Sequence, residues 1–290
     1  MIVAKALIFN NERSKFLNFN SIEHPIALQV GGNDPLMLGE IAKIAEDWGY
    51  DEINLNIGCP SQKVQSGDFG ACLMARPALV ANCIEKMKSK SKIPVTVKHR
   101  TGIDNLNSDK FLIDFVDQVS KAGADRFIIH ARKALLSGLD PKQNRNIPPL
   151  EYNKVANLKK QRPDLIIELN GGLQNPYDCL EALKFADGAM VGRAIYSHPM
   201  NWQKIDSIIF KEKLNSIKAS EIISKLIPYA EDHISEGGRI WNISRHLLKL
   251  VEGVPGAKKW RYELTNKSQK KDAKIIVLEE AARQLKEVGL

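Results

Sequence analysis

The sequence lacks long apolar runs, and it has few cysteines. No apolar stretch approaches the roughly 20 residues that a membrane-spanning helix requires, so we expect no membrane association. Its cysteines show no metal-ligand spacing and predict no metal site; they are Cys59, Cys72, Cys83 and Cys179. The amino terminus has no basic region and no cleavage-site pattern. We therefore expect no signal peptide and a reducing, cytoplasmic setting.

The composition is that of a basic globular protein. The chain has 290 residues, and 43% of them are hydrophobic, which is ample for a packed core. The 42 basic residues exceed the 34 acidic ones and give a net charge of +8. This excess indicates an anionic partner, nucleic acid first, although many basic enzymes bind no polymer.

Short β-type runs alternate with helical patterns along most of the chain. The predicted strands are Ile2–Leu7, Ile26–Val30, Glu52–Asn56, Val95–Lys98, Phe127–His130, Leu165–Asn170 and Gly188–Val191. The predicted helices between and after them are Pro35–Trp48, Pro77–Ser89, Ser108–Ala122, Leu150–Gln161, Pro176–Phe185 and Pro199–Phe210. Such alternation predicts an α/β fold with a parallel sheet, here a (β/α)8 TIM barrel. Residues between Leu7 and Pro25 lack a helical period and predict a hairpin or loop.

The strand pattern stops after about residue 210. Three amphipathic helices are predicted beyond it, at Ser220–Ser235, Arg239–Glu252 and Ser268–Val288. We therefore expect a barrel domain over residues 1–210 and a helical domain over residues 211–290.

The chain is organised around Glu52–Met74, which reads EINLNIGCPSQKVQSGDFGACLM. Its first six residues alternate polar and apolar side chains, as a strand does. Gly58-Cys59-Pro60 ends that strand, because proline cannot continue a central strand. Cys59 is either a small buried hydrophobe or a reactive thiol. Its polar, turn-rich loop and the preceding Asn56 favour the second interpretation.

Polar residues stand at the ends of successive predicted strands: Gln29, Asn56, Lys98, His130 and Asn170, with Gly192-Arg193 after the last strand. In a barrel these ends converge on one mouth, which holds the active site. Asn170-Gly171-Gly172 and Gly192-Arg193 offer backbone N–H groups and a guanidinium, which can bind a phosphate.

A basic run with interleaved aromatic residues lies in the predicted helical domain. Its basic members are Lys258, Lys259, Arg261, Lys267, Lys270, Lys271 and Lys274, and its aromatic members are Trp260 and Tyr262. A solvated helix face explains the charges alone. The interleaved aromatic residues favour contact with RNA.

Taken together, these motifs resemble the tRNA-dihydrouridine synthases, most closely the bacterial A-type branch. The resemblance covers nearly the whole chain. The matching words include Ala27-Leu28-Gln29-Val30-Gly31-Gly32, Leu55-Asn56-Ile57-Gly58-Cys59-Pro60-Ser61, Pro94-Val95-Thr96-Val97-Lys98-His99-Arg100, His130-Ala131-Arg132-Lys133, Asn170-Gly171-Gly172, Val191-Gly192-Arg193 and Pro255-Gly256-Ala257-Lys258-Lys259-Trp260-Arg261.

The resemblance implies an FMN-dependent enzyme that reduces a D-loop uridine of tRNA, at position 20 or 20a, with NADPH. It implies that Cys59 is the general acid and that Asn56 holds the uracil. The implied contacts to FMN or its phosphate are Gln29, Lys98, His130, Asn170, Gly171, Gly172, Gly192 and Arg193. The implied tRNA contacts are Lys142, Arg145, Lys258 and Arg261. A monomer without a metal is expected.

The chain departs from the family pattern at its beginning. The family begins with a strand that ends in a Pro-Met flavin contact and is followed by a helix, and this chain begins at what corresponds to the second strand. We therefore expect seven strands instead of eight, and a Met1 that is not the native start or a gene that has decayed. Two alternatives stay open: another FMN barrel reductase, similar to dihydroorotate dehydrogenase, and a flavin-free RNA-binding remnant.

Overall fold

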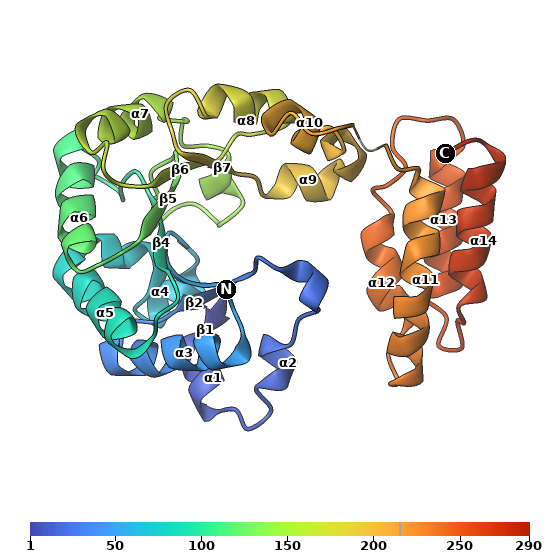
Figure 1. Ribbon diagram of the computed structural model, residues 1–290, viewed down its shortest axis with the longest axis horizontal. Coiled ribbons are helices and arrows are strands. Elements are labelled where there is room, and N and C mark those ends of the chain that lie inside the picture. The colour runs from blue at the N-terminus through green and yellow to red at the C-terminus, as the bar shows by residue number, and fades with distance from the viewer. Residues whose placement is uncertain (215) are drawn as a thin grey trace. The chain divides into compact units, whose positions relative to one another are not determined.

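The computed structural model describes residues 1–214 and 216–290 (Figure 1). They form two compact units, which we describe separately. The first contains Met1–Gly172 and Glu181–Met190, and the second contains Leu173–Leu180 and Val191–Leu290. The domain boundary at residue 210, drawn from where the predicted strands end, stays a prediction.

The first unit is built on a sheet of parallel strands in sequential order. The strands are β1 (Ile2–Val3), β2 (Ala27–Gly31), β3 (Glu52–Ile57), β4 (Val95–Arg100), β5 (Arg126–His130), β6 (Ile167–Asn170) and β7 (Gly188–Met190). Each strand pairs in parallel with the next one along the chain. Seven parallel strands alternating with helices confirm the predicted barrel-type architecture.

Helices surround this sheet and follow their strands in chain order. The longer ones, α3 (Pro35–Trp48), α5 (Pro77–Lys90), α6 (Asp109–Lys121) and α7 (Tyr152–Gln161), form an arc around the strands in Figure 1. Shorter ones are α4 (Gln62–Ser66), η2 (Gly70–Ala75) and η3 (Gln143–Arg145), whereas α8 (Pro176–Ala182) begins in the second unit and ends in the first. Local sequence sets these bounds: Asp34 accepts the Met37 N–H at 3.1 Å to begin α3, and Gly49 ends it with φ +93°.

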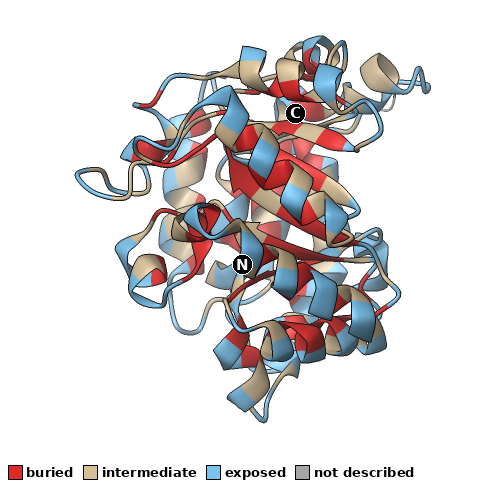
Figure 2. Cartoon of the chain, turned by 90° about the vertical axis from the view of Figure 1, so that its left-hand side faces the viewer, coloured by how far each residue is buried: buried red, intermediate tan, exposed pale blue. Residues whose placement is uncertain are grey.

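The two faces of β3 have different chemistry. Ile53, Leu55 and Ile57 are fully buried. Alternate residues point to opposite faces of a sheet, so Glu52, Asn54 and Asn56 share the other face. The apolar face packs toward the surrounding helices, and Figure 2 shows that the strands are largely buried while the outer helix faces are exposed. The polar face lies inside the barrel.

The amino-terminal prediction is wrong in part. Only Ile2–Val3 pair as a strand, and the following residues form α1 (Ala4–Phe9) instead of continuing it. Ala4 and Leu7, three residues apart, are the buried residues of this helix. The prediction of a hairpin or loop between Leu7 and Pro25 is wrong in part, because no hairpin forms and the loop there contains the short helices α2 (Ser14–Leu17) and η1 (Ser21–Glu23).

The second unit is helical. Its elements are α9 (Arg193–Ser197), η4 (Pro199–Trp202), α10 (Ile205–Ile209), α11 (Ala219–Ser235), α12 (Ile240–Leu247), α13 (Ala257–Ser268) and α14 (Ile276–Glu287). Two predictions need correction here: the helix expected over 199–210 is two short helices, and α13 was not predicted. Ala257, Trp260 and Leu264 of α13 are buried in a core shared with α11, α12 and α14.

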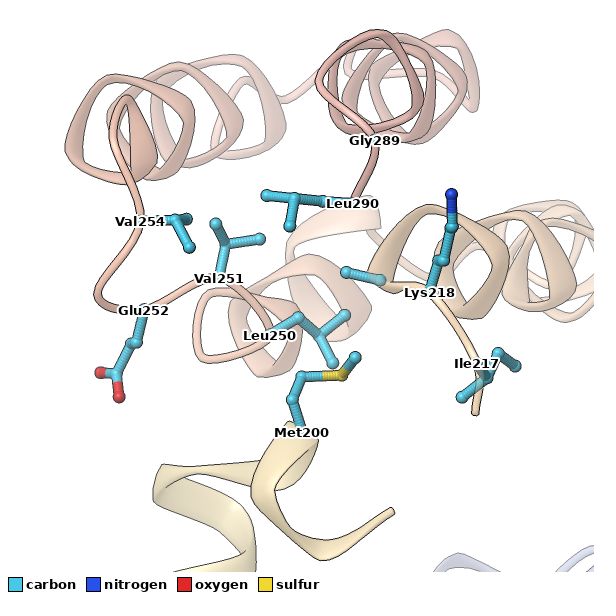
Figure 3. A pocket seen from close by; sticks show the side chains of 10 residues that line it. Met200, Ile217, Lys218, Leu250, Val251, Glu252, Val254, Gly289 and Leu290 are labelled. Atoms are coloured by element: carbon cyan, nitrogen blue, oxygen red, sulfur yellow. The ribbon is translucent and has the colours of Figure 1, made fainter. Parts of the chain in front are cut away.

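An apolar pocket in this unit is lined by Met200, Leu250, Val251, Val254 and Leu290, together with other side chains (Figure 3). None of the residues predicted to be functional lines it. The candidate site is therefore elsewhere. Of the helices in residues 1–214 and 216–290, none is both long enough and apolar enough to cross a membrane.

Candidate active site

Asn56 connects the end of β3 to the loop that carries Cys59. Its carbonyl oxygen accepts the backbone N–H groups of Gly58 at 3.1 Å and Cys59 at 3.0 Å. Its amide nitrogen donates to the side-chain carbonyl of Gln29 on β2 at 3.0 Å. Three of the predicted site residues are therefore held in one hydrogen-bonded group.

The Cys59 loop is folded back on itself and fixed at its carbonyl. Cys59 O accepts the Ala71 N–H at 2.9 Å, and a Cβ on Gly70 would lie 2.6 Å from that oxygen. Gly70 also has φ +79°, so only glycine fits there without strain. The Cys59 side chain is half-buried, and its sulfur lies 3.6 Å from the Ser61 hydroxyl. This thiol is partly accessible, unlike that of Cys83.

Arg100, at the end of β4, stabilises the same loop, although its sequence context predicted no role for it. Its Nε donates to Gly58 O at 2.9 Å, and its Nη1 donates to Asn144 O at 2.9 Å and Lys133 O at 3.2 Å. Burial lowers the pKa of this guanidinium to about 10, so it stays charged at neutral pH. The sequence signals for Arg100 were its place two residues after Lys98 at a strand end and its presence in the matching run Pro94–Arg100.

Lys98 and Asn170 meet across the barrel interior. The ammonium of Lys98 on β4 donates to the Asn170 side-chain oxygen on β6 at 2.8 Å. Asn170 in turn donates to Met190 O on β7 at 2.8 Å. Burial, with a smaller contribution from the nearby Arg100 charge, lowers the pKa of Lys98 to about 8. Among the described residues Lys98 has no carboxylate partner.

The glycine pair after β6 lies against His130. A Cβ on Gly171 would be 2.5 Å from the imidazole of His130, which is 9% exposed. Gly171 has φ +104° and Gly172 has φ +78°, a backbone that side chains rarely adopt. Tyr152 donates its hydroxyl to Gly171 O at 2.7 Å. The pair therefore brings its backbone close to the end of β5.

Lys142 and Arg145 lie on the loop between β5 and α7, which Asn144 holds together. The buried Asn144 side chain accepts from Leu135 N at 2.8 Å and donates to Leu135 O at 2.9 Å. Lys142 is exposed. The Nε of Arg145 is buried with no hydrogen-bond partner in the part of the chain that the structure describes.

The remaining predicted residues belong to the second unit. Gly192 and Arg193 stand at the start of α9, and a Cβ on Gly192 would meet no atom within 4 Å. Lys258 on α13 is exposed, whereas Arg261 is half-buried and donates to Val251 O at 2.5 Å. Trp260 does not fit the expected RNA contact, because it is 6% exposed and donates to Ala281 O at 3.1 Å in the helical core.

Comparison with known proteins gives one family. The family model described as "Dihydrouridine synthase (Dus)" matches residues 1–286. The tRNA-dihydrouridine(20/20a) synthase of Synechocystis is 48% identical over 100% of this chain and 86% of its own length. The proteins of the same name from Shewanella oneidensis and Salmonella typhimurium are 46% and 45% identical, over 92% and 98% of this chain and 79% and 85% of their own lengths.

Proposed function

Because the chain belongs to the dihydrouridine synthase family, we propose that it reduces a D-loop uridine of tRNA, at position 20 or 20a, to dihydrouridine with FMN and NADPH. The observation that carries the proposal is the linked group of Gln29, Asn56 and the Cys59 loop at the carboxyl end of the sheet. This is the place where parallel barrels hold their active sites.

The residues of the barrel interior fit FMN. A lysine without a carboxylate partner among the described residues suits the electron-rich edge of a flavin, and Lys98 has this character. Gly171 and Gly172 bring backbone close to His130, and Gly192 leaves open space beside Arg193, as a phosphate requires. The residues that would hold FMN are Gln29, Lys98, His130, Asn170, Gly171, Gly172, Gly192 and Arg193. FMN, when bound, supplies the hydride that NADPH has delivered to it.

The protein's own residues would supply the proton and the orientation. Asn56 would hold the uracil, and the Cys59 thiol would donate a proton to C5 of the base as negative charge develops there. Arg100 would keep the loop in place by binding the carbonyl of Gly58. A loop fixed at Gly58, at Cys59 N and at Cys59 O needs little rearrangement when the base arrives.

Two basic regions would hold the tRNA. Lys142 and Arg145 extend from the loop after β5 and would contact the nucleotide through their charged groups. Lys258 and Arg261 lie on α13 of the helical unit and would contact phosphates. The target base is stacked within folded tRNA, so it must leave the stack to reach Cys59.

The test is a reconstituted reaction. Purified protein, FMN, NADPH and an unmodified tRNA transcript are incubated, and the digested RNA is analysed by mass spectrometry for dihydrouridine and its position. Dihydrouridine at position 20 or 20a supports the proposal. Oxidation of dihydroorotate instead would support the other barrel reductase, and tRNA binding without FMN binding would support the flavin-free remnant.

A further inference from the structure

The barrel interior holds polar side chains where branched apolar ones are usual. Glu52, Asn54 and Asn56 on β3 all face inward, and Thr96 lies beside Asn54 on β4. Asn54 is 4% exposed and Thr96 is 1% exposed. Burying such groups is unfavourable unless each is hydrogen-bonded. The hydrogen bonds of these residues therefore decide whether their burial is tolerated.

They form one continuous chain of hydrogen bonds. The Thr96 hydroxyl bonds to the Glu52 carboxylate, which also pairs with Arg126. The Asn54 amide nitrogen donates to the Thr96 oxygen at 2.8 Å. Gln29 donates to the Asn54 oxygen at 2.7 Å, and Asn56 donates to the Gln29 oxygen at 3.0 Å. We call Glu52, Thr96, Asn54, Gln29 and Asn56 the amide relay.

The hydrogen bonds of the relay can have only one donor-to-acceptor direction. A carboxylate beside a guanidinium accepts hydrogen bonds only, so the single hydroxyl proton of Thr96 points to Glu52. The Thr96 oxygen is then an acceptor, which turns the NH2 group of Asn54 toward it. The Asn54 oxygen therefore faces Gln29, and the Gln29 oxygen faces Asn56.

The mouth end of the relay agrees with this direction. The Asn56 oxygen accepts the N–H groups of Gly58 and Cys59, so a flipped Asn56 amide would place donor against donor. The side-chain carbonyls of Gln29 and Asn56 therefore both accept hydrogen bonds from groups of the protein itself. Each amide keeps one N–H that the relay does not use, and that N–H is left for a ligand.

We propose that Thr96, acting through Asn54, is a positioning residue that holds the Gln29 amide in its orientation toward the flavin, while the loop N–H groups hold Asn56. The inference rests on the proposed function for the identity of the ligands, while the relay itself exists without them. Thr96 touches neither ligand in this scheme. Its effect is on the orientation of the Gln29 amide near the mouth.

The first test examines the relay in the ligand-free protein. Solvent exchange of the side-chain amide protons of Gln29 and Asn56 is measured by NMR in protein labelled selectively at asparagine and glutamine nitrogen. In Thr96→Val, which keeps the β-branched shape, we expect faster exchange at the Gln29 amide and a smaller change at Asn56, which the loop N–H groups still hold. Thr96→Ser keeps the hydroxyl and is expected to preserve wild-type protection. Unchanged exchange in Thr96→Val would overturn the relay.

The second test measures FMN binding by fluorescence titration. We expect Thr96→Val to weaken FMN affinity about tenfold, because a buried amide loses its acceptor, and Thr96→Ser to stay within about twofold. Thr101→Val is the matched control: Thr101 is also buried and donates to Glu151 at 2.5 Å, outside the relay. It should lower thermal stability comparably while FMN affinity stays within about twofold.

The outcomes separate the two proposals. Equal FMN affinity in wild type and Thr96→Val, or equal loss in Thr96→Val and Thr101→Val, overturns the positioning role. Wild-type protein that binds no FMN but shows the expected exchange pattern overturns the proposed function and upholds the relay. If Thr96→Val does not fold, Thr96→Cys retains a weak donor and is expected to show an intermediate change in exchange and affinity.

Discussion

Side chains at the barrel mouth are held by hydrogen bonds, whereas lysine side chains on the basic face of α13 are exposed to solvent. At the barrel mouth, Asn56 is fixed by Gln29 and the loop N–H groups, and Lys98 is fixed by Asn170. On α13, Lys258 is exposed, and the side chain of Lys259 is 83% exposed, 3.9 Å from Glu263. One region is preorganised, and the other can adjust to its partner.

This difference predicts two kinds of mutational response. Buried, interlocked polar groups lose function sharply, because removing one partner leaves the others unsatisfied. Exposed charges on a helix act additively and are screened by salt. The proposed catalysis should therefore be lost when a single side-chain group is removed. The proposed tRNA affinity should instead decrease in small steps as charges are removed.

Removing the thiol should produce the largest loss. In Cys59→Ala, we expect uridine reduction in single-turnover assays to slow by roughly 10²- to 10⁴-fold, the range for loss of a positioned proton donor. FMN affinity and tRNA affinity should stay within about twofold, because the loop is held through backbone atoms that alanine keeps. Dihydrouridine is quantified by mass spectrometry.

Cys72→Ala is the control for this variant. Cys72 is also half-buried and lies in η2 of the same connection, where its sulfur bonds to Phe69 O at 3.2 Å. We expect turnover close to wild type. Near-normal turnover in Cys59→Ala, or an equal loss in both variants, would remove Cys59 from the mechanism.

The sequence predicted most of the sheet because its alternation of apolar and polar residues matches which side chains the folded sheet buries. Ile53, Leu55 and Ile57 alternate with polar residues, and the structure buries all three on one face of β3. The run after Ile2 is different, because a short apolar stretch is compatible with the period of a strand and with that of a helix. Ala4 and Leu7 are spaced for a helix, and the helix forms.

The sequence could indicate candidate site residues only where the residue type and its position at a strand end were themselves informative. Asn56, Cys59 and Lys98 stand out as polar residues at strand ends. Arg100 does not, because its role depends on carbonyls from Gly58, Lys133 and Asn144, which are far apart in sequence. Trp260 gave the opposite error: beside lysines it indicated RNA contact, but its spacing from Ala257 and Leu264 is that of a buried helix face.

Lys98 should give the barrel mouth a characteristic pH response. Its folded pKa of about 8 lies below that of an ordinary lysine, so it loses its charge as pH rises through 8. FMN affinity should therefore fall, by up to about tenfold per pH unit, between pH 8 and 9. Lys98→Met should bind FMN weakly, with a flat profile over pH 7 to 9, when followed by fluorescence titration.

The ligand-free protein should respond to the same titration in the opposite direction. The unfolded chain keeps the Lys98 proton above pH 8 while the folded chain loses it, so the free energy of unfolding contributed by this group rises from about pH 8 to 10.5. The free energy of unfolding is measured against pH for wild type and Lys98→Met, and the difference between the two curves gives the contribution of Lys98. A pH-independent FMN affinity in wild type would show that the Lys98 charge does not contribute to binding.

The smallest effect is expected on α13. Lys258→Glu should weaken tRNA binding several-fold and reduce the slope of log affinity against log salt by about 1, since one phosphate contact is lost. FMN affinity should not change.

Arg261→Glu should reduce the slope similarly but also lower thermal stability, because Arg261 donates to Val251 O within the helical unit. Lys258 is therefore the cleaner probe of the surface. Lys110→Glu on α6 is the control, because it makes the same change in net charge at a side chain that is 81% exposed. If Lys110→Glu reduces the filter-binding salt slope as much as Lys258→Glu does, overall charge explains the binding and α13 has no specific role in it.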